Sequence, residues 1–107
     1  MRVFIDECID WRLSRDIIGH DVKTAHQIGW DDVKNGALLA LVAGKFDMFV
    51  TVDRNLAFQN RVTHLSFAVM VLQVHTNRLA DLRPLVPDLL RLMLQVQPGE
   101  LVQIGSK

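Results

Sequence analysis

The chain has 107 residues, half of them hydrophobic, with 12 basic and 12 acidic residues and a formal net charge of zero. This length allows one domain with a substantial core but not two, and no apolar run reaches the roughly 18 residues that a membrane span needs. Zero net charge argues against a protein that binds nucleic acid through bulk charge alone, but not against an enzyme that meets a polyanion briefly. Because the chain opens on a strand pattern instead of a signal peptide, we expect a cytoplasmic protein with no membrane partner.

Apolar runs alternate with amphipathic stretches along the chain, which is typical of an α/β fold. Helices are expected from residue 11 to about Gly19, over 33–43 and from Pro84 onward, with a short irregular helix or loop over 55–60. Strands and helices alternating in this way require right-handed crossovers. The sequence therefore predicts one domain, a three-layer α/β/α sandwich with a mostly parallel central sheet. The expected strands cover residues 1–5, 21–25, 48–52, 65–74 and 100–104, the last at an edge of the sheet.

Two of the predicted strands end in acidic side chains. The apolar run over 48–52 has no helical period and predicts a strand buried on both faces, and Asp53 follows where that strand leaves the sheet. The first strand likewise runs into Asp6 and Glu7. Ligands and catalytic groups of an open α/β sheet gather outside the carboxyl ends of its parallel strands. We therefore expect Asp6 and Asp53 to converge at one edge of the sheet.

Carboxylates gathered in one place repel one another, and a bound cation removes this cost. Mg²⁺ and Mn²⁺ prefer oxygen ligands and keep several waters, so a few carboxylates and a substrate phosphate make a workable site. Such a metal lowers the pKa of a bound water and stabilises charge on a phosphate, as phosphodiester hydrolysis requires. We predict this role for Asp6 and Asp53, with helix capping as the alternative. Glu7 has three open roles: metal ligand, nearby base, or acidic residue in the first turn of a helix.

Polar residues that follow the third and fourth strands lie on the same predicted edge. Arg54 and Asn55 come directly after Asp53, and Asn77 and Arg78 follow the fourth strand. We expect these four side chains to bind substrate by holding phosphate oxygens, or to orient the carboxylates. Their alternative role is that of turn residues and caps.

Charge is distributed unevenly along the chain. Residues 1–53 hold six Lys and Arg against nine Asp and Glu, whereas residues 54–107 hold six against three. An acidic pocket with a basic margin suits a metal ion and a polyanionic substrate. Solvated surface charge that happens to fall in this way is the alternative.

The sequence offers little support for other kinds of site. Cys8 is the only cysteine, so it cannot form an internal disulfide, and we expect a buried, inert thiol. The four histidines show none of the spacings that a zinc site needs. No glycine-rich phosphate loop, nucleophile elbow or dinucleotide-binding fingerprint is present.

Several segments of the chain form a familiar pattern. They are the opening strand with Asp6-Glu7, then Gly19-His20-Asp21-Val22, Asn35-Gly36 at the start of a Leu-rich helix, Phe49-Val50-Thr51-Val52-Asp53-Arg54-Asn55-Leu56, and Asn77-Arg78-Leu79-Ala80-Asp81-Leu82-Arg83-Pro84-Leu85. With these segments the chain resembles the small bacterial PIN-like family, and the resemblance extends over nearly the whole chain. Members of this family are known as domains of unknown function and as predicted toxin components of toxin–antitoxin pairs.

The resemblance implies a PIN fold and a Mg²⁺- or Mn²⁺-dependent ribonuclease, with Asp6 and Asp53 as metal-site acids. It also implies RNA as substrate, a cognate antitoxin protein as partner and, by analogy, a homodimer. PIN nucleases place a further acid at the start of the helix before the third strand, where this chain has Asn35. Because an amide oxygen can bind a metal but brings no charge, we expect weaker metal binding unless Asp31 or Asp32 reaches the site.

Two other functions stay open on the sequence. Asn35 in place of an acid favours a PIN-shaped protein that binds RNA or a partner protein without cleaving. Receiver domains, which accept a phosphoryl group on Asp, also carry an acid pair after the first strand and an Asp after the third, and Thr76 nearly fits their hydroxyl residue after the fourth. They additionally need a Lys after the fifth strand, where this chain has Gly105-Ser106-Lys107. The final helix of a receiver is lacking.

Overall fold

The computed structural model describes residues 1–33, 35–53, 65–74, 76 and 78–105. Its strands form one parallel sheet in the order β2-β1-β3-β4-β5. This arrangement confirms the α/β class and the position of the last strand at a sheet edge. The strands are β1 (Arg2–Ile5), β2 (Asp21–Thr24), β3 (Met48–Thr51), β4 (Ala68–Leu72) and β5 (Leu101–Ile104).

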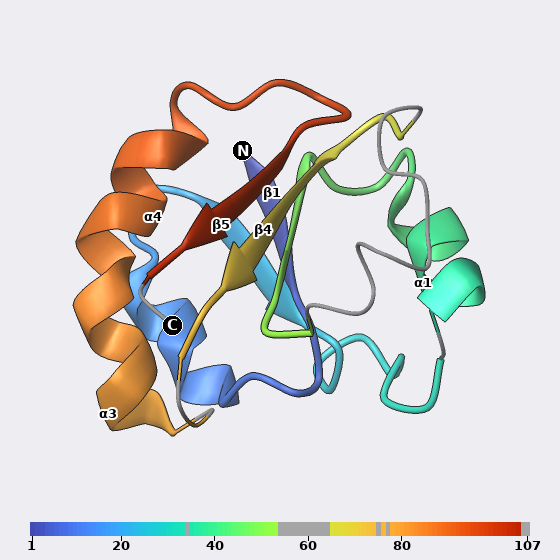
Figure 1. The fold of residues 1–107 in the computed structure, drawn as a ribbon. Helices are drawn as coiled ribbons and strands as arrows, with labels where there is room; N and C mark the ends of the chain where they lie inside the picture. Colours follow the sequence, from blue (N-terminus) through green and yellow to red (C-terminus); the bar gives the residue numbers. More distant parts are fainter. Residues whose placement is uncertain (34, 54–64, 75, 77, 106–107) are drawn as a thin grey trace.

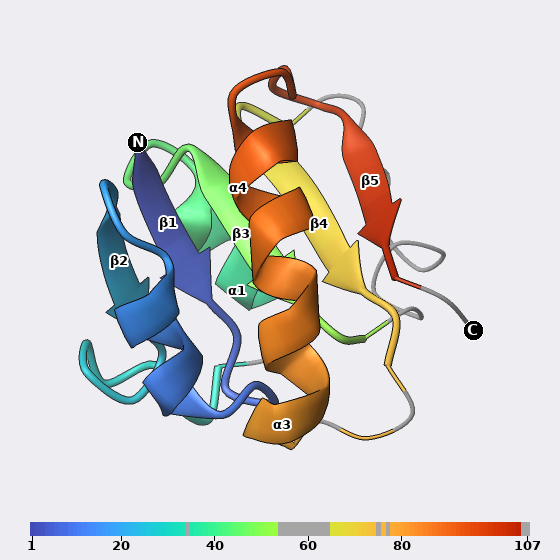
Figure 2. The ribbon, with the colours of Figure 1, turned by 90° about the vertical axis from the view of Figure 1, so that its left-hand side faces the viewer.

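Helical elements cover both faces of the sheet (Figure 1). Figure 2 shows η1, α3 and α4 in front of the strands and α1 behind them. The described part of the chain is therefore compatible with three layers, with the sheet in the middle. The helical elements are η1 (Trp11–Asp16), α1 (Asn35–Val42), α3 (Leu79–Leu82), η2 (Arg83–Leu85) and α4 (Val86–Met93).

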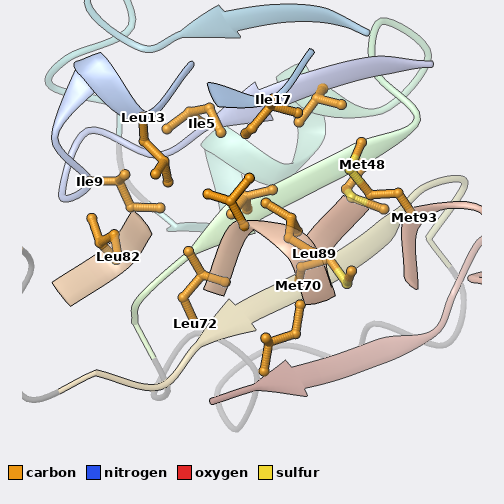
Figure 3. Close-up of a cluster of buried hydrophobic side chains, with 14 of the residues drawn as sticks. Ile5, Ile9, Leu13, Ile17, Met48, Met70, Leu72, Leu82, Leu89 and Met93 are labelled. Carbon is orange, nitrogen blue, oxygen red and sulfur yellow. The ribbon is translucent and has the colours of Figure 1, made fainter. Parts of the chain in front are cut away.

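Alternating side chains along the strands divide the core into two clusters, one on each face of the sheet. In β1, Val3 and Ile5 pack with η1 and α4, whereas Phe4 packs with α1. Figure 3 shows the first of these clusters, in which Leu82 and Leu89 face the strand residues. All four residues of β3 are buried, as predicted for a central strand covered on both faces.

The strand order places a topological switch point between β1 and β3. The chain leaves β1 for β2 on one side, and it leaves β3 for β4 on the other side. This order is that of flavodoxin-like doubly wound sheets, in which ligands bind in the crevice outside the strand ends at the switch point. All strands point toward the end of the sheet where α3 begins (Figure 2). The ends of β1 and β3 are therefore the favoured place for a site.

The first predicted α-helix is wrong in type, because η1 is a 3₁₀ helix. The N–H of Leu13 donates to the carbonyl of Asp10, and the N–H of Ile17 also bonds a carbonyl three residues back. Leu13 and Ile17 are buried, while Trp11 and Ile18 are 50% and 73% exposed. The apolar residues of this stretch therefore do not form a single buried face.

The last helical segment begins earlier than predicted, at Leu79 instead of near Pro84, and it is interrupted. Pro84 and Pro87 have no N–H, so neither can donate to a carbonyl four residues earlier. The N–H of Val86 donates instead to the carbonyl of Arg83, three residues back, at the end of η2. The two prolines thus divide the segment into an α-helix, a 3₁₀ turn and a second α-helix.

The bounds of β1, β2, β3, β5 and α1 coincide with the prediction or differ from it by one or two residues. The fourth strand is the largest difference, since β4 covers five residues within the expected range 65–74. The helix or loop expected over 55–60 lies outside the described residues. Within the described part of the chain, none of the helices combines the length and apolar composition that crossing a membrane would take.

Gly105, directly after β5, is at a position where any other residue is predicted to be strained. Its φ is +105°, and an added Cβ would lie 2.5 Å from the carbonyl oxygen of Gln73. We expect Gly105→Ala to lower the free energy of unfolding by about 1–3 kcal/mol in urea denaturation. Gly36→Ala is the matched control, because Gly36 has open space around it and no positive φ. Equal stability of both variants would contradict this strain at Gly105.

Candidate functional site

A cavity of about 740 Å³ opens at the carboxyl ends of β1 and β2. Its walls come from the loop after β1, the start of η1, the loop after β2, and Arg78 just before α3. The volume lies in the usual range for binding sites of small molecules and single nucleotides. The lining acids are Asp6, Glu7, Asp10 and Asp31.

Asp6 is 9% exposed and is held by the sheet and by its own loop. Its N–H donates to the carbonyl of Val50 at 3.0 Å, which extends the pairing of β1 with β3 by one residue. Its carboxylate accepts from the Glu7 N–H at 2.8 Å, from the Thr51 hydroxyl at 2.8 Å, and from the Cys8 thiol at 3.3 Å. Three donors therefore fix the orientation of a carboxylate that lines the cavity.

Asp53 is connected to Asp6 through the hydroxyl of Thr51. The Asp53 N–H donates to Thr51 Oγ1 at 3.0 Å, and the same hydroxyl donates to Asp6. The structure thus brings the two predicted metal-site acids to the ends of neighbouring strands. Asp53 is half-buried, however, and it is not among the residues that line the cavity. Of these two acids, Asp6 and not Asp53 lines the cavity.

Asp10 is already neutralised by Arg12. The Arg12 side chain donates to both carboxylate oxygens of Asp10, at 3.0 and 2.6 Å. These side-chain bonds and the Arg12 backbone N–H lower the pKa of Asp10 to about 2. Asp10 is therefore ionised at neutral pH, and its charge and that of Arg12 cancel in the cavity.

Asp31 adds a carboxylate, which on the sequence was expected only as a substitute for an acid at Asn35. Asp31 Oδ2 lies 3.1 Å from His26 Nδ1, while its Oδ1 is buried and has no hydrogen-bond partner among the described residues. A buried carboxylate oxygen without a donor is costly, and a cation would supply the missing partner. The signal that could have identified this region is that β2 ends at the same edge as β1.

The structure describes some of the remaining predicted site residues and not others. Glu7 and Arg78 are exposed and line the cavity, and Arg78 makes no ion pair with any described residue. Asn35 is the first residue of α1, but its side chain is outside the described part of the chain. The predictions for Arg54, Asn55 and Asn77 fall on residues that the structure does not describe.

The described side chains fit a divalent cation only with help from water or substrate. Within residues 1–33, 35–53, 65–74, 76 and 78–105, no three His, Cys, Asp or Glu side chains lie close enough to hold a metal together. Mg²⁺ is usually bound by one or two carboxylates, with waters and substrate phosphates completing its coordination. Because Asp6 and Asp31 both line the cavity, an open site of this kind suits them better than an all-protein cage.

Cys8 is predicted to react slowly despite lining the cavity. Burial, followed by the nearby Asp6 carboxylate, raises the pKa of its thiol from 9.0 to about 11. Since only the thiolate is nucleophilic, we expect alkylation by iodoacetamide at pH 8 to be about 100-fold slower in the folded protein than in urea. Mass spectrometry at timed intervals measures this ratio. Equal rates in both states would show that the thiol is not protected by the fold.

Comparisons with known proteins do not add a function. No family model matches this chain, and no curated protein and no solved structure is detectably similar to it. The resemblance to the PIN-like family therefore stays a prediction. A function for this protein has to come from the cavity, its charges and its place in the sheet.

Proposed function

We propose that this protein is a metal-dependent endoribonuclease that hydrolyses RNA phosphodiester bonds at the strand-end cavity. The observation that carries the proposal is the gathering of Asp6, Glu7 and Asp31 around one cavity with the exposed Arg78. On the resemblance described above, we further propose that it is the toxin of a bacterial toxin–antitoxin pair. A cognate antitoxin protein and a second copy of the chain would then be its partners.

The charge of the cavity supports a cation as cofactor. After Asp10 and Arg12 cancel, the carboxylates of Asp6, Glu7 and Asp31 face the single guanidinium of Arg78 among the described lining residues. Such a surplus of negative charge repels a phosphate diester unless a cation is bound. Mg²⁺ or Mn²⁺ held by Asp6 and Asp31 would activate water and stabilise charge on the phosphate.

The side chains of the cavity have distinct roles in this proposal. The donors from Glu7, Thr51 and Cys8 hold the Asp6 carboxylate in one orientation, so no reorganisation is needed on binding. The exposed Glu7 carboxylate can accept a proton from the attacking water. Arg78 can donate to phosphate oxygens and position the substrate.

Cleavage of a labelled, unstructured RNA with and without Mn²⁺ tests the proposal. We expect cleavage in Mn²⁺, none in excess EDTA, and recovery when Mn²⁺ is restored. Asp31→Asn should lower the rate, because it removes the negative charge of this carboxylate. Asp53→Asn tests the predicted role of Asp53, which lies outside the cavity lining.

Controls make the result decisive. Asp88→Asn removes an exposed carboxylate on α4 that pairs with Arg91, and it should cleave as the wild type does. Cleavage that persists in EDTA and is equal in every variant would indicate a contaminating nuclease and would contradict the proposal. RNA binding without any cleavage would instead favour the non-cleaving binding protein that Asn35 suggests.

The strand order favours one second candidate, a receiver-like phosphoacceptor domain. The order β2-β1-β3-β4-β5 is shared with receivers, and Asp53 follows β3 where their phosphoacceptor stands. Incubation with acetyl phosphate would then produce a stable adduct at Asp53, detectable by mass spectrometry. Absence of that adduct in Mg²⁺, together with metal-dependent cleavage, would leave the nuclease as the function.

A further inference from the structure

The exposed indole of Trp11 in the cavity lining is not used by the proposed chemistry. Trp11 is 50% exposed and lines the cavity at the start of η1. It makes no aromatic contact with the described rings, which gather instead around Phe4, Trp30 and Phe46 in the core. The flat apolar surface of the Trp11 ring is therefore exposed beside the acidic residues of the cavity and is not part of the core.

Arg15 fixes the position of this indole. The guanidinium carbon of Arg15 lies 4.7 Å from the centre of the Trp11 ring, a cation–π contact across one turn. Because one face of the ring is occupied by a cation, the ring is oriented before any ligand arrives. An oriented aromatic ring loses less conformational entropy on binding than a freely rotating one.

Arg15, on the ring, and Arg78, in the cavity lining, have no carboxylate partner in the described part of the chain. Arg15 and Arg78 make no ion pair there, in contrast to Arg12, which is held by Asp10. Unpaired guanidinium groups beside an aromatic ring are the features with which proteins bind single-stranded nucleic acids, through phosphates and stacked bases. A base inside a duplex is not available for stacking unless it is extruded, at a cost of a few kcal/mol.

We infer that the substrate of this site is single-stranded RNA and that an unpaired base stacks on Trp11, with Arg15 and Arg78 on its phosphates. This inference rests on the proposed function, since it names the substrate class of the same cavity. It assigns to Trp11 a role in binding and not in the chemical step. A phosphate next to the stacked base would then lie close to the cation that the cavity acids are proposed to hold.

Binding measured without cleavage tests the inference. Fluorescence anisotropy in Ca²⁺ would compare a labelled oligouridylate, the same strand in a duplex, and an abasic strand of equal charge. We expect Trp11→Leu to weaken binding of the oligouridylate about 5- to 100-fold and to leave the abasic strand unaffected. Trp11→Phe keeps a ring and should retain most of the affinity. Equal binding of the oligouridylate by wild type and Trp11→Leu, or no binding by the wild type, would overturn the inference.

Indole fluorescence gives an independent readout. In Trp30→Phe, whose ring keeps the aromatic contacts with Phe4 and Phe46, Trp11 is the only tryptophan. Its emission should be quenched by the oligouridylate and not by the abasic strand, and unchanged emission would count against stacking. If RNA binding depends on Trp11 but no cleavage occurs, only the proposed nuclease function is rejected. If cleavage occurs and Trp11→Leu changes neither binding nor cleavage, only the inference about Trp11 is rejected.

Discussion

Asp6→Asn is expected to lower the rate of Mn²⁺-dependent RNA cleavage at least about 100-fold. Asp6 lines the cavity at the end of β1, and three donors orient its carboxylate. Asparagine keeps the shape and one acceptor oxygen for the Glu7 N–H, but it removes the negative charge and presents an amide to the Thr51 hydroxyl. The loss should therefore appear in the cleavage rate at saturating RNA and Mn²⁺, with a smaller loss of thermal stability.

Two measurements separate a lost site from a lost fold. Circular dichroism should show that Asp6→Asn is folded at the assay temperature, and Asp88→Asn should cleave like the wild type. Arg78→Ala should raise the RNA concentration needed for half-maximal rate, because Arg78 is assigned to the phosphate and not to the cation. If folded Asp6→Asn cleaved RNA at the wild-type rate, the strand-end cavity would not be the site of cleavage.

Thr51→Val should destabilise the protein by roughly 1–3 kcal/mol and also reduce cleavage. Thr51 is fully buried, and its hydroxyl donates to Asp6 and accepts from the Asp53 N–H. Valine has nearly the same shape, so the change removes these hydrogen bonds without opening a large cavity. Urea denaturation measures the stability, and the cleavage assay measures the effect of releasing the Asp6 carboxylate.

Thr51→Ser is the matched control for this prediction. Serine keeps the hydroxyl and loses one buried methyl group, at a cost of about 1 kcal/mol. Cleavage should therefore survive in Thr51→Ser and fall in Thr51→Val. If serine and valine reduced cleavage equally, packing around Thr51 and not its hydrogen bonds would be what matters.

The parallel sheet was predictable because its strands carry a strong and local signal. Met48–Thr51 is apolar on both faces, and only a strand covered by helices on two sides tolerates that pattern. We could also predict that the ends of β1 and β3 lie close together, because functional groups of an open α/β sheet gather outside the carboxyl ends of its parallel strands. The helical boundaries were less predictable, since Pro84 and the 3₁₀ bonds of η1 depend on local hydrogen bonding that apolar periodicity does not report.

The site was predicted only at the level of the backbone. The sequence pointed to the edge where Asp6 and Asp53 emerge, but not to which of them lines the cavity. That outcome depends on the Thr51 hydroxyl and on the loop after β2, which brings His26 and Asp31 to the same cavity. Contacts between residues distant in sequence decide these positions, and a single sequence carries no direct signal of them.

Titration of the protein with Mn²⁺, followed by isothermal calorimetry or by the paramagnetic signal of free Mn²⁺, tests most directly whether this cavity binds a divalent cation. The wild type should bind one Mn²⁺, and Asp6→Asn and Asp31→Asn should each weaken that binding at least about tenfold. Asp88→Asn should bind as the wild type does. Equal Mn²⁺ affinity in all four proteins, or no binding by any of them, would contradict a cation site at the ends of β1 and β2.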